Sequence, residues 1–419
     1  MPNILVSTQI DGEHVEVGDL LFAPGRHDSH TARFTYDAEF IRRGWPIDPA
    51  LRLDDAAHDL RGLPLAIEDA SPDSWGQMLL QRAERHAAGD AGRGSRQLTP
   101  DQFLLAASDA TRQGALRFRL EQDGPFLAED GHIPKTLELA TLLAAADETA
   151  GDPGSQEWEA FERLLEAGSS ALGGARPKAA VVDEDGGLWL AKFPRPGEGT
   201  NVPAWEMTAL DVAERAGLTT PPRRLLTVAG RQVLLVRRFD REDDGTRRHY
   251  ISTRTLLGAR DLGTAADYGG RRGIAGRLAR ESCAPRTDLR LLWKQAALNV
   301  LVNNTDNHLR NHGLLRGDGG WRLAPVFDLD PNPDTGTQFN TLFGGAAYRT
   351  TALRGLFTIA DDCDLDQGQA RAALGEVHEA VGGWDVAARD YGAPAAEVGL
   401  FEAAFTGLDK DIEKTLVSS

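Results

Sequence analysis

The stretch at 303–313 reads NNTDNHLRNHG, and its eleven residues carry one carboxylate, four side-chain amides, two imidazoles and one guanidinium. It directly follows LRLLWKQAALNVLV, an apolar run whose pattern is typical of a helix. Because every unpaired polar group inside a protein costs free energy, so many polar side chains cannot be buried there without partners. The stretch therefore predicts a site that holds charged ligands.

The spacing within this stretch points to phosphoryl transfer. Asp306 and Asn311 are five residues apart, which is the Asp-x4-Asn spacing of a kinase catalytic loop. In that spacing the carboxylate accepts the proton of a hydroxyl, and the amide oxygen binds Mg²⁺, a cation that prefers oxygen ligands. Asp328, in APVFDLDP, is a candidate second metal ligand, although Leu329 and Asp330 replace the Phe and Gly of the kinase DFG motif. Asp-x4-Asn alone also occurs by chance in long chains.

Two predicted hairpins with a helix between them precede this stretch. KAAVV and LWLAKF flank a turn at 183–187, and RRLLTV and QVLLVRRF flank a turn at 229–230. Between the hairpins, PAWEMTALDVAERAGL begins with Pro and ends near Gly, as helices do. Beyond residue 250 the pattern is mostly helical, with one short hairpin (GLLR and WRLAPVFD) directly after the polar stretch. This order is typical of a protein-kinase-like fold.

Candidate nucleotide-binding residues lie on these predicted elements. Lys192, in LWLAKF, has the position of the strand lysine that contacts phosphates in kinases, and Glu206 in the next helix could pair with it. Gly173 and Gly174, in SSALGGARPK, would let backbone N–H groups approach phosphates. Each has an ordinary alternative, because Lys192 can be a surface lysine, Glu206 can favour a helix N-terminus and the glycines can form a plain turn. The order and spacing together are more specific than any one part.

Composition excludes several classes of protein. The 419 residues suffice for two or three domains, and the net charge of −17 disfavours general binding to nucleic acid or to an anionic membrane. Cys283 and Cys363 have no paired-ligand spacing, which disfavours a zinc site or a disulfide scaffold and favours a reducing cytoplasm. The N-terminus turns polar too early for a signal peptide, and no run of about 18 apolar residues predicts a membrane span. We therefore expect a cytoplasmic protein that does not enter membranes.

The charge is distributed unevenly. The Arg-rich stretch, residues 221–290, has sixteen arginines, no lysine and eight acidic residues, a formal charge of +8. It is either a solvated face or a docking surface for phosphate or for an acidic partner. A further alternative is that these arginines contact only ATP and an internal loop.

Taken together, these motifs resemble the HipA family, bacterial serine/threonine kinases that act as toxins in type II toxin–antitoxin pairs. NTDNHLRNHG resembles that family's catalytic loop, LAPVFDLDP its metal-binding segment, SSALGGARPKA its phosphate loop and LAKFP its nucleotide lysine. VRRFDR resembles the hinge that holds adenine, and ASPDSWGQMLLQR (70–82) resembles an N-terminal segment of the type LLPDxWG. The chain departs from a uniform family pattern at Ala171 and Pro177, where members differ among themselves.

The resemblance spans most of the chain and implies an α+β fold of the protein-kinase-like, HipA-like type. Its N-terminal part would be rich in β-strands and its C-terminal lobe mostly helical. The implied parts are a HipA-type N-terminal subdomain (1–160), a nucleotide-binding subdomain with the phosphate loop (161–238) and a helical catalytic domain (239–419).

The resemblance also implies roles for individual residues, with ATP and Mg²⁺ as cofactors. Asp306 would be the base, and Asn311 and Asp328 would be the metal ligands. Ser169 or Ser170 would be autophosphorylated, and an extra residue in SSALGG leaves open which of the two. The residues implied to bind ATP are Lys192, Gly173, Gly174, Ala175, Arg176, Lys178, Glu206, Arg237, Phe239 and His308.

The implied activity is phosphorylation of a serine or threonine on a protein substrate, such as an aminoacyl-tRNA synthetase. The implied partner is a HipB-like helix-turn-helix antitoxin that restrains the kinase and connects it to DNA. Two alternatives stay open: a weakly active kinase-fold regulator in an antitoxin–DNA complex, and a small-molecule phosphotransferase. The complete set Lys192, Asp306, Asn311 and Asp328 disfavours the regulator, and the HipA-like motifs within 1–160 disfavour the small-molecule enzyme.

Overall fold

The computed structural model describes residues 3–10, 12–23, 30–128, 133–149, 157–174, 176–260 and 266–417. The chain forms two compact units, each made of two separate pieces. Unit 1 contains residues 1–197 and 226–250, and unit 2 contains residues 198–225 and 251–419. The helix between the two hairpins thus belongs with the C-terminal part of the chain, and the division into 1–160, 161–238 and 239–419 stays a prediction.

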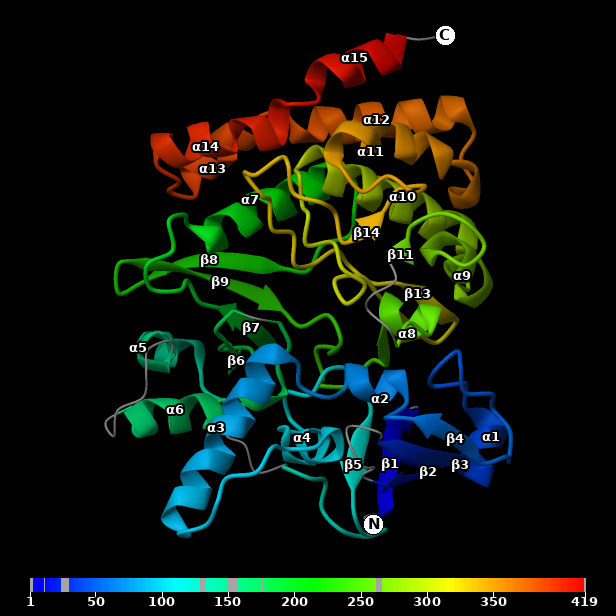
Figure 1. The fold of residues 1–419 in the computed structure, drawn as a ribbon, viewed down its shortest axis with the longest axis vertical. Helices are drawn as coiled ribbons and strands as arrows, with labels where there is room; N and C mark the ends of the chain where they lie inside the picture. The colour runs from blue at the N-terminus through cyan, green and yellow to red at the C-terminus, as the bar shows by residue number, and fades with distance from the viewer. Residues whose placement is uncertain are drawn as a thin grey trace. The chain divides into compact units, whose positions relative to one another are not determined.

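Unit 1 begins with an antiparallel sheet in the order β4-β3-β2-β1-β5 (Figure 1). Its strands are β1 (Asn3–Ile10), β2 (Glu13–Ala23), β3 (Thr31–Tyr36), β4 (His58–Arg61) and β5 (Arg117–Arg119). Val6, Leu20 and Phe34 are buried on one face of this sheet, and Phe40 of α1 (Ala38–Arg43) packs into the same core. Burial of such large apolar side chains is the main source of stability for this sheet.

A second core of unit 1 joins helices to the second sheet. The helices of this core are α3 (Ser74–Asp90), α5 (Leu139–Thr149) and α6 (Glu157–Glu166), with short 3₁₀ turns η1 (Thr136–Glu138) and η2 (Ser169–Ala171) nearby in sequence. The other two helices, α2 (Leu65–Asp69) and α4 (Pro100–Ala106), instead contribute Ile67 and Leu104 to the first core. Trp75 of α3, Leu142 of α5 and Phe161 of α6 pack with the buried strand residues Val181 and Val233. The helices α3, α5 and α6 therefore share one apolar interior with the second sheet.

The second sheet has the order β6-β7-β9-β8, and it confirms both predicted hairpins (Figure 1). Its strands are β6 (Lys178–Val182), β7 (Leu188–Lys192), β8 (Arg223–Val228) and β9 (Arg231–Arg237). In the first hairpin the carboxylate of Asp183 accepts hydrogen bonds from the N–H of Gly187 and from the indole of Trp189, both at 2.8 Å. This turn fixes the register that places the end of β7 beside the start of β6.

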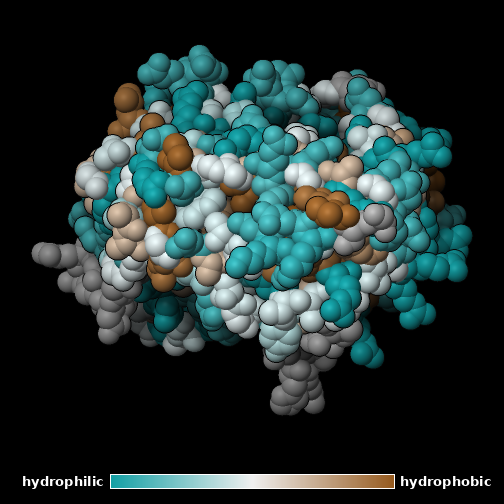
Figure 2. Space-filling model, turned by 90° about the horizontal axis from the view of Figure 1, so that it is seen from above, coloured by the Kyte–Doolittle hydropathy of each residue, from teal (hydrophilic) through white to brown (hydrophobic). Residues whose placement is uncertain are grey.

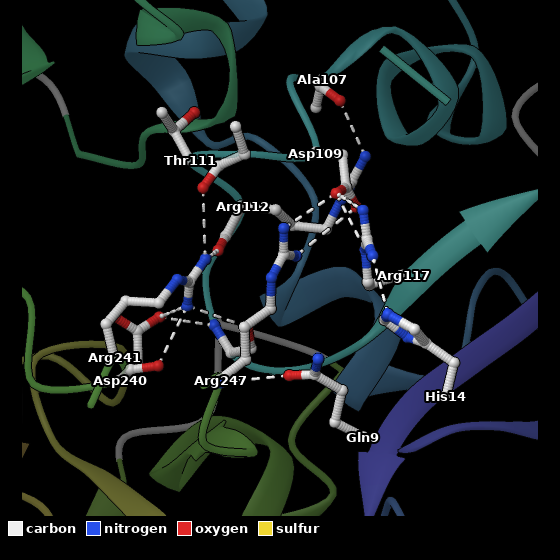
Figure 3. Close-up of polar contacts among 12 residues, drawn as sticks. Gln9, His14, Ala107, Asp109, Thr111, Arg112, Arg117, Asp240, Arg241 and Arg247 are labelled. Carbon is white, nitrogen blue, oxygen red and sulfur yellow. Dashed lines mark hydrogen bonds and ion pairs between the residues drawn. The ribbon is translucent and has the colours of Figure 1, made fainter. Parts of the chain in front are cut away.

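Part of the Arg-rich stretch lies inside unit 1, as Figure 3 shows for Arg241 and Arg247. Arg238 and Arg241 bind the buried carboxylate of Asp240 at 2.6 and 3.0 Å, and Arg247 binds Asp109 at 2.8 Å. At most 11% of each of these three guanidinium-bearing side chains is exposed. For these arginines the expectation of a solvated face or a docking surface is wrong, because their donors are taken by internal carboxylates and backbone carbonyls.

Unit 2 is mostly helical and is built around α10 (Pro285–Leu301), which confirms the helix expected before the polar stretch (Figure 1). Its other helices are α7 (Val202–Arg215), α8 (Thr253–Leu257), α9 (Ile274–Glu281), α11 (Arg349–Thr358), α12 (Gln367–Val381), α13 (Trp384–Asp390), α14 (Ala395–Thr406), α15 (Asp409–Val417) and the 3₁₀ turn η3 (Asp361–Cys363). The indole of Trp293 on α10 is fully buried and donates to the carbonyl of Leu356 on α11 at 3.0 Å. The helix thereby provides a rigid support for the polar stretch that follows it.

Short strands flank this support. The three-stranded sheet β10-β12-β13 is made of β10 (Tyr250–Ser252), β12 (Gly313–Gly317) and β13 (Gly320–Leu323). β11 (Ala266–Asp267) pairs in parallel with β14 (Thr341–Leu342). The β12–β13 hairpin is the one predicted directly after the polar stretch.

Within the part of the chain that the structure describes, no helix is long and apolar enough to cross a membrane. On the face drawn in Figure 2, hydrophilic residues predominate and hydrophobic ones form small, separate patches.

Candidate functional site

The polar stretch leaves α10 through a left-handed residue. Asn303 has a φ of +52°, a conformation that asparagine tolerates better than most residues. Its amide nitrogen donates to the carbonyls of Asn332 and Asp334, at 2.6 and 3.1 Å, and its own carbonyl accepts from the N–H of Asn332 at 3.0 Å. We refer to residues 303–312 as the catalytic loop, after the kinase motif that they resemble. The start of this loop is thereby fastened to the segment that follows β13.

Asp306 and Asn311 lie together in this loop. The amide nitrogen of Asn311 donates to the carbonyl of Asp306 at 2.8 Å, so its amide oxygen is the atom left to accept or to bind a cation. The carboxylate of Asp306 is exposed and accepts a hydrogen bond from the amide of Asn340 at 3.0 Å. The imidazole of His308 is 4.0 Å from the same carboxylate. The loop therefore presents an accessible carboxylate beside an oriented amide oxygen.

Asp328 is the second candidate metal ligand, and it has an unusual backbone. Its φ of +52° is uncommon for a residue other than glycine, and such outliers occur often at functional sites. The segment around it is anchored on both sides. The N–H of Val326 donates to the carbonyl of Thr219 at 2.8 Å, and the amide of Asn332 donates to the hydroxyl of Thr305 at 2.9 Å. The second of these bonds ties the Asp328 segment to the catalytic loop.

The donor atoms of these two segments fit a magnesium ion. Asn311 offers an amide oxygen and Asp328 a carboxylate, which are the hard oxygen ligands that Mg²⁺ prefers. Among the described residues there is no group of three or more His, Cys, Asp or Glu side chains that could hold a metal. A magnesium site that uses one amide, one carboxylate and phosphate oxygens needs no such group.

A buried polar network supports the catalytic loop from behind. The fully buried His312 accepts at Nδ1 from the amide of Gln295 at 2.9 Å, and its Nε2 lies 2.8 Å from the hydroxyl of Tyr268. Asn299 donates to the same hydroxyl at 2.9 Å. Burial, with a smaller contribution from His308, lowers the pKa of His312 to about 3. The imidazole is therefore neutral at pH 7, and its Nε2–H donates to Tyr268.

The other half of the predicted site lies in unit 1. Lys178 and Lys192 are directly paired on the antiparallel strands β6 and β7, so their side chains lie on the same face of the hairpin. Residues 168–178, which we call the phosphate loop after the family segment that they resemble, lead into β6. Gly174 has a φ of +79°, and a Cβ placed there would lie 2.5 Å from the ammonium of Lys178. The structure thus brings two cations and a glycine turn together, which is an arrangement suited to an anion.

The remaining predicted nucleotide residues are distributed over both units. Arg176 is half-buried in the phosphate loop, and Ala175 lies outside the described residues. Arg237 ends β9 and forms an ion pair with Asp243 at 2.7 Å, while Phe239 follows shortly after the strand. A further predicted residue, Glu206, is buried on α7 in unit 2, whereas Lys192 belongs to unit 1, and their pairing stays a prediction.

The two serines proposed for modification are buried in η2. Ser170 is 4% exposed, and its hydroxyl accepts from the N–H of Ser108 at 3.3 Å. Ser169 is fully buried, and its hydroxyl has no hydrogen-bond partner among the described residues. A phosphate on either side chain would not fit in this interior, so its attachment would require η2 to leave its place.

Sequence reasoning did not find four residues of the site region. They are Asn340, Tyr268, Gln295 and Asn299. Asn340 is 34 residues from Asp306, and Tyr268 is 44 residues from His312. Only Gln295 and Asn299 carry a local signal, because they are polar residues four apart among the buried apolar residues at the C-terminal end of α10.

Comparison with known proteins places these features in a family. The family profile described as a HipA-like C-terminal domain matches residues 170–384, just over half of the chain. Y4mE of Sinorhizobium fredii, which carries the name of a candidate kinase, is 31% identical over 181 residues. That match covers 38% of this chain and 41% of Y4mE, so the chain spans less than half the length of this curated relative.

The solved structure of a HipA protein confirms the α+β, HipA-like fold expected from the sequence. HipA of Shewanella oneidensis MR-1, solved with HipB and its operator DNA, has a TM-score of 0.69 at 16% identity. The likeness covers 98% of this chain and 97% of that one. The proinflammatory kinase CtkA of Helicobacter pylori has a TM-score of 0.38 at 17% identity, over 57% of this chain and 91% of CtkA.

Proposed function

The chain belongs to the family of proteins with a HipA-like C-terminal domain, and from this premise we propose that it is a protein kinase that uses ATP and Mg²⁺ to phosphorylate serine or threonine hydroxyls. The observation that carries the proposal is the geometry of the catalytic loop. The Asn311 amide is anchored to the Asp306 carbonyl at 2.8 Å, with the Asp306 carboxylate exposed beside it. This arrangement suits a base next to a cation ligand.

In the proposed reaction the substrate hydroxyl oxygen bonds to the γ-phosphorus of ATP while the bond from that phosphorus to the β-phosphate oxygen breaks, which releases ADP. Asp306 accepts the hydroxyl proton, and Asn340 holds the carboxylate in orientation. Asn311 and Asp328 would hold Mg²⁺, which supplies positive charge to the phosphate oxygens when it is bound. Lys178 and Lys192 supply further positive charge, and most of the rate enhancement comes from positioning and electrostatics.

Autophosphorylation of Ser169 or Ser170 would switch this activity off. A phosphoserine carries roughly −1.5 to −2 charges at pH 7, and both serines are buried at the start of the phosphate loop. Modification would displace η2, and with it the loop that we assign to the phosphates of ATP. Phosphopeptide mapping after incubation with ATP tests this point. Unmodified Ser169 and Ser170 in protein that has turned over would rule out both as regulatory sites.

The proposed partner is a HipB-like helix-turn-helix antitoxin that restrains the kinase and links it to DNA, and the proposed target is a protein such as an aminoacyl-tRNA synthetase. The likeness in fold to HipA that was solved with HipB and operator DNA supports the partner. The net charge of −17 supports an indirect link to DNA, because an acidic chain repels phosphates.

One experiment separates this proposal from the two alternatives. Protein is incubated with γ-labelled ATP and Mg²⁺, first alone, then with candidate protein substrates, then with small-molecule phosphate acceptors. We expect label on the chain itself or on a protein. Label only on a small molecule would favour the phosphotransferase, and no transfer despite ATP binding would favour the regulator.

A further inference from the structure

The N-terminal segment PDSWG, residues 72–76, contacts the phosphate loop through its backbone. We propose that this segment is a template that sets the shape of the phosphate loop, with Trp75 and Gly76 as positioning residues for ATP. The inference rests on the proposed function, because it assigns to the loop the phosphates of ATP. All the residues involved belong to unit 1.

The hydrogen bonds at the start of α3 are the first observation. The first N–H groups of a helix have no partner within the helix. The N–H of Ser74 donates to the carboxylate of the N-cap residue Asp73 at 2.7 Å. An N-cap side chain usually accepts from the second or third N–H instead. Here the N–H of Trp75 donates to the carbonyl of Gly174 at 2.9 Å, and that of Gly76 donates to the carbonyl of Leu172 at 3.3 Å.

The glycine at position 76 is the second observation. Its φ is not positive, so it gains nothing there from the conformational freedom of glycine. A glycine inside a helix costs about 0.5–1 kcal/mol relative to alanine. A Cβ at this position would come within 3.0 Å of the backbone oxygens of Ser170 and Leu172, and also of the Pro72 side chain. The close approach of the phosphate loop is therefore the physical reason for a glycine at this position.

Further contacts hold the loop at both of its ends. The indole N–H of Trp75 donates to the carbonyl of Lys178 at 3.1 Å, where the loop enters β6. At the other end the hydroxyl of Thr111 donates to the carbonyl of Gly168 at 2.7 Å. The N–H of Ser108 donates to the Ser170 hydroxyl. The loop is thus fixed at several points by residues that precede it by more than fifty positions.

These bonds also determine which way the loop's N–H groups point. A peptide unit is planar and trans, so its carbonyl and its N–H point in opposite directions. Because the Leu172 carbonyl points to the first turn of α3, the N–H of Gly173 points away from that helix. The template therefore turns the Leu172 carbonyl towards α3 and leaves the Gly173 N–H on the opposite side of the loop, where we propose that it faces a phosphate of ATP, as N–H groups do in anion-binding backbone concavities.

A matched pair of glycine-to-alanine substitutions in α3 tests the proposal. Gly76→Ala forces the loop to shift, whereas a Cβ at Gly89 of the same helix meets nothing within 4 Å. Binding of a non-hydrolysable ATP analogue with Mg²⁺, and of adenosine, is measured by calorimetry. For Gly76→Ala we expect the analogue affinity to fall by roughly 10- to 100-fold, because small displacements at a site are costly. Adenosine affinity should stay within about twofold of wild type, since only the phosphates use the loop.

Gly89→Ala should match wild type with both ligands. Unchanged analogue affinity in folded Gly76→Ala, or an equal loss of adenosine affinity, would overturn the proposal. Circular dichroism and the unfolding midpoint show whether each variant is folded.

A second measurement does not depend on the variants. In wild-type protein the backbone N–H groups of Trp75 and Gly76 should exchange with deuterium slowly, in contrast to the ordinarily exposed first turn of a helix. Fast exchange of these two amides would refute the template even if ATP binds. If wild-type protein binds no ATP, the proposed function fails, and slow exchange of these amides would still support the template.

Discussion

At the scale of single residues, the catalytic loop is arranged by hydrogen bonds that leave specific atoms available. The Asn311 amide donates to a carbonyl within the loop, so its oxygen is the candidate cation ligand. Asp306 is held by Asn340 and remains exposed. The spacing of Asp306 and Asn311 could be predicted from the sequence because it lies within one loop. Asn340 could not, because it lies 34 residues away and is brought to the loop by hydrogen bonds between distant segments, such as that from its N–H to the Thr305 carbonyl at 3.2 Å.

If Asp306 is the base, its substitution should slow phosphoryl transfer without weakening ATP binding. Asp306→Asn keeps an oxygen that can accept from Asn340 but removes the base, so phosphoryl transfer should fall by about 10²–10⁴-fold. ATP affinity should stay unchanged. Asparagine tolerates the left-handed backbone at position 328, so Asp328→Asn should fold normally. This substitution removes the charge of a proposed metal ligand, so it should weaken Mg²⁺-dependent ATP binding in addition to phosphoryl transfer. Transfer rates with labelled ATP and calorimetric titrations at two Mg²⁺ concentrations measure both effects.

Asp318→Asn, in the exposed turn of the β12–β13 hairpin, is the matched control and should behave as wild type. Wild-type turnover by Asp306→Asn would show that another group accepts the proton.

At the scale of elements, periodicity and turn chemistry predict the two hairpins and α10, because each depends on residues close in sequence. The Arg-rich stretch shows where such reasoning stops. Composition predicts the net charge of this stretch, but whether each arginine is buried or exposed depends on partners that are distant in sequence, such as Asp109. Although burial by itself raises the pKa of Asp240, the neighbouring Arg238 and Arg241 guanidiniums lower it below its usual range. Arg241 also donates to the backbone carbonyls of Arg112 and Gly114, which joins the segment after β9 to the loop before β5.

This buried network predicts both a mutational and a pH effect. Asp240→Asn leaves Arg238 and Arg241 without their counter-charge, so the free energy of unfolding should fall by about 3–5 kcal/mol. A carboxyl whose pKa is lowered by folding contributes stability that is present above its unfolded pKa, near 4, and is lost as the pH falls through the folded value. Wild-type protein should therefore lose stability below about pH 4 more steeply than Asp240→Asn.

Urea unfolding followed by circular dichroism at several pH values between 3 and 7 measures this difference. Asp318→Asn again serves as the control, since its side chain is exposed. Parallel pH profiles for wild type and Asp240→Asn would mean that the network does not stabilise the ionised carboxyl.

At the scale of the whole molecule, the sequence motifs predict the fold because they are ordered along the entire chain. The likeness to HipA over 98% of the chain confirms this. The motifs do not predict that each compact unit takes two pieces of the chain, with 198–225 joining the C-terminal piece. That division depends on the packing of α7 with helices such as α12 and α13, which are far away in sequence.

The proposed antitoxin partnership predicts the behaviour of the whole chain towards DNA. With a net charge of −17, and with Arg238, Arg241 and Arg247 engaged inside unit 1, the isolated chain should bind operator DNA weakly. Around α9 and the start of α10, the side chains of Arg271, Arg272 and Arg290 are exposed, so phosphates or acidic side chains can reach them. Binding in the presence of a HipB-like antitoxin should therefore be stronger than binding by the chain alone, and it should weaken as salt rises. Gel shifts at two salt concentrations, with and without that antitoxin, measure this. Tight operator binding by the isolated chain, or no complex with such an antitoxin, would contradict the partnership, because the proposed link to DNA runs through the antitoxin.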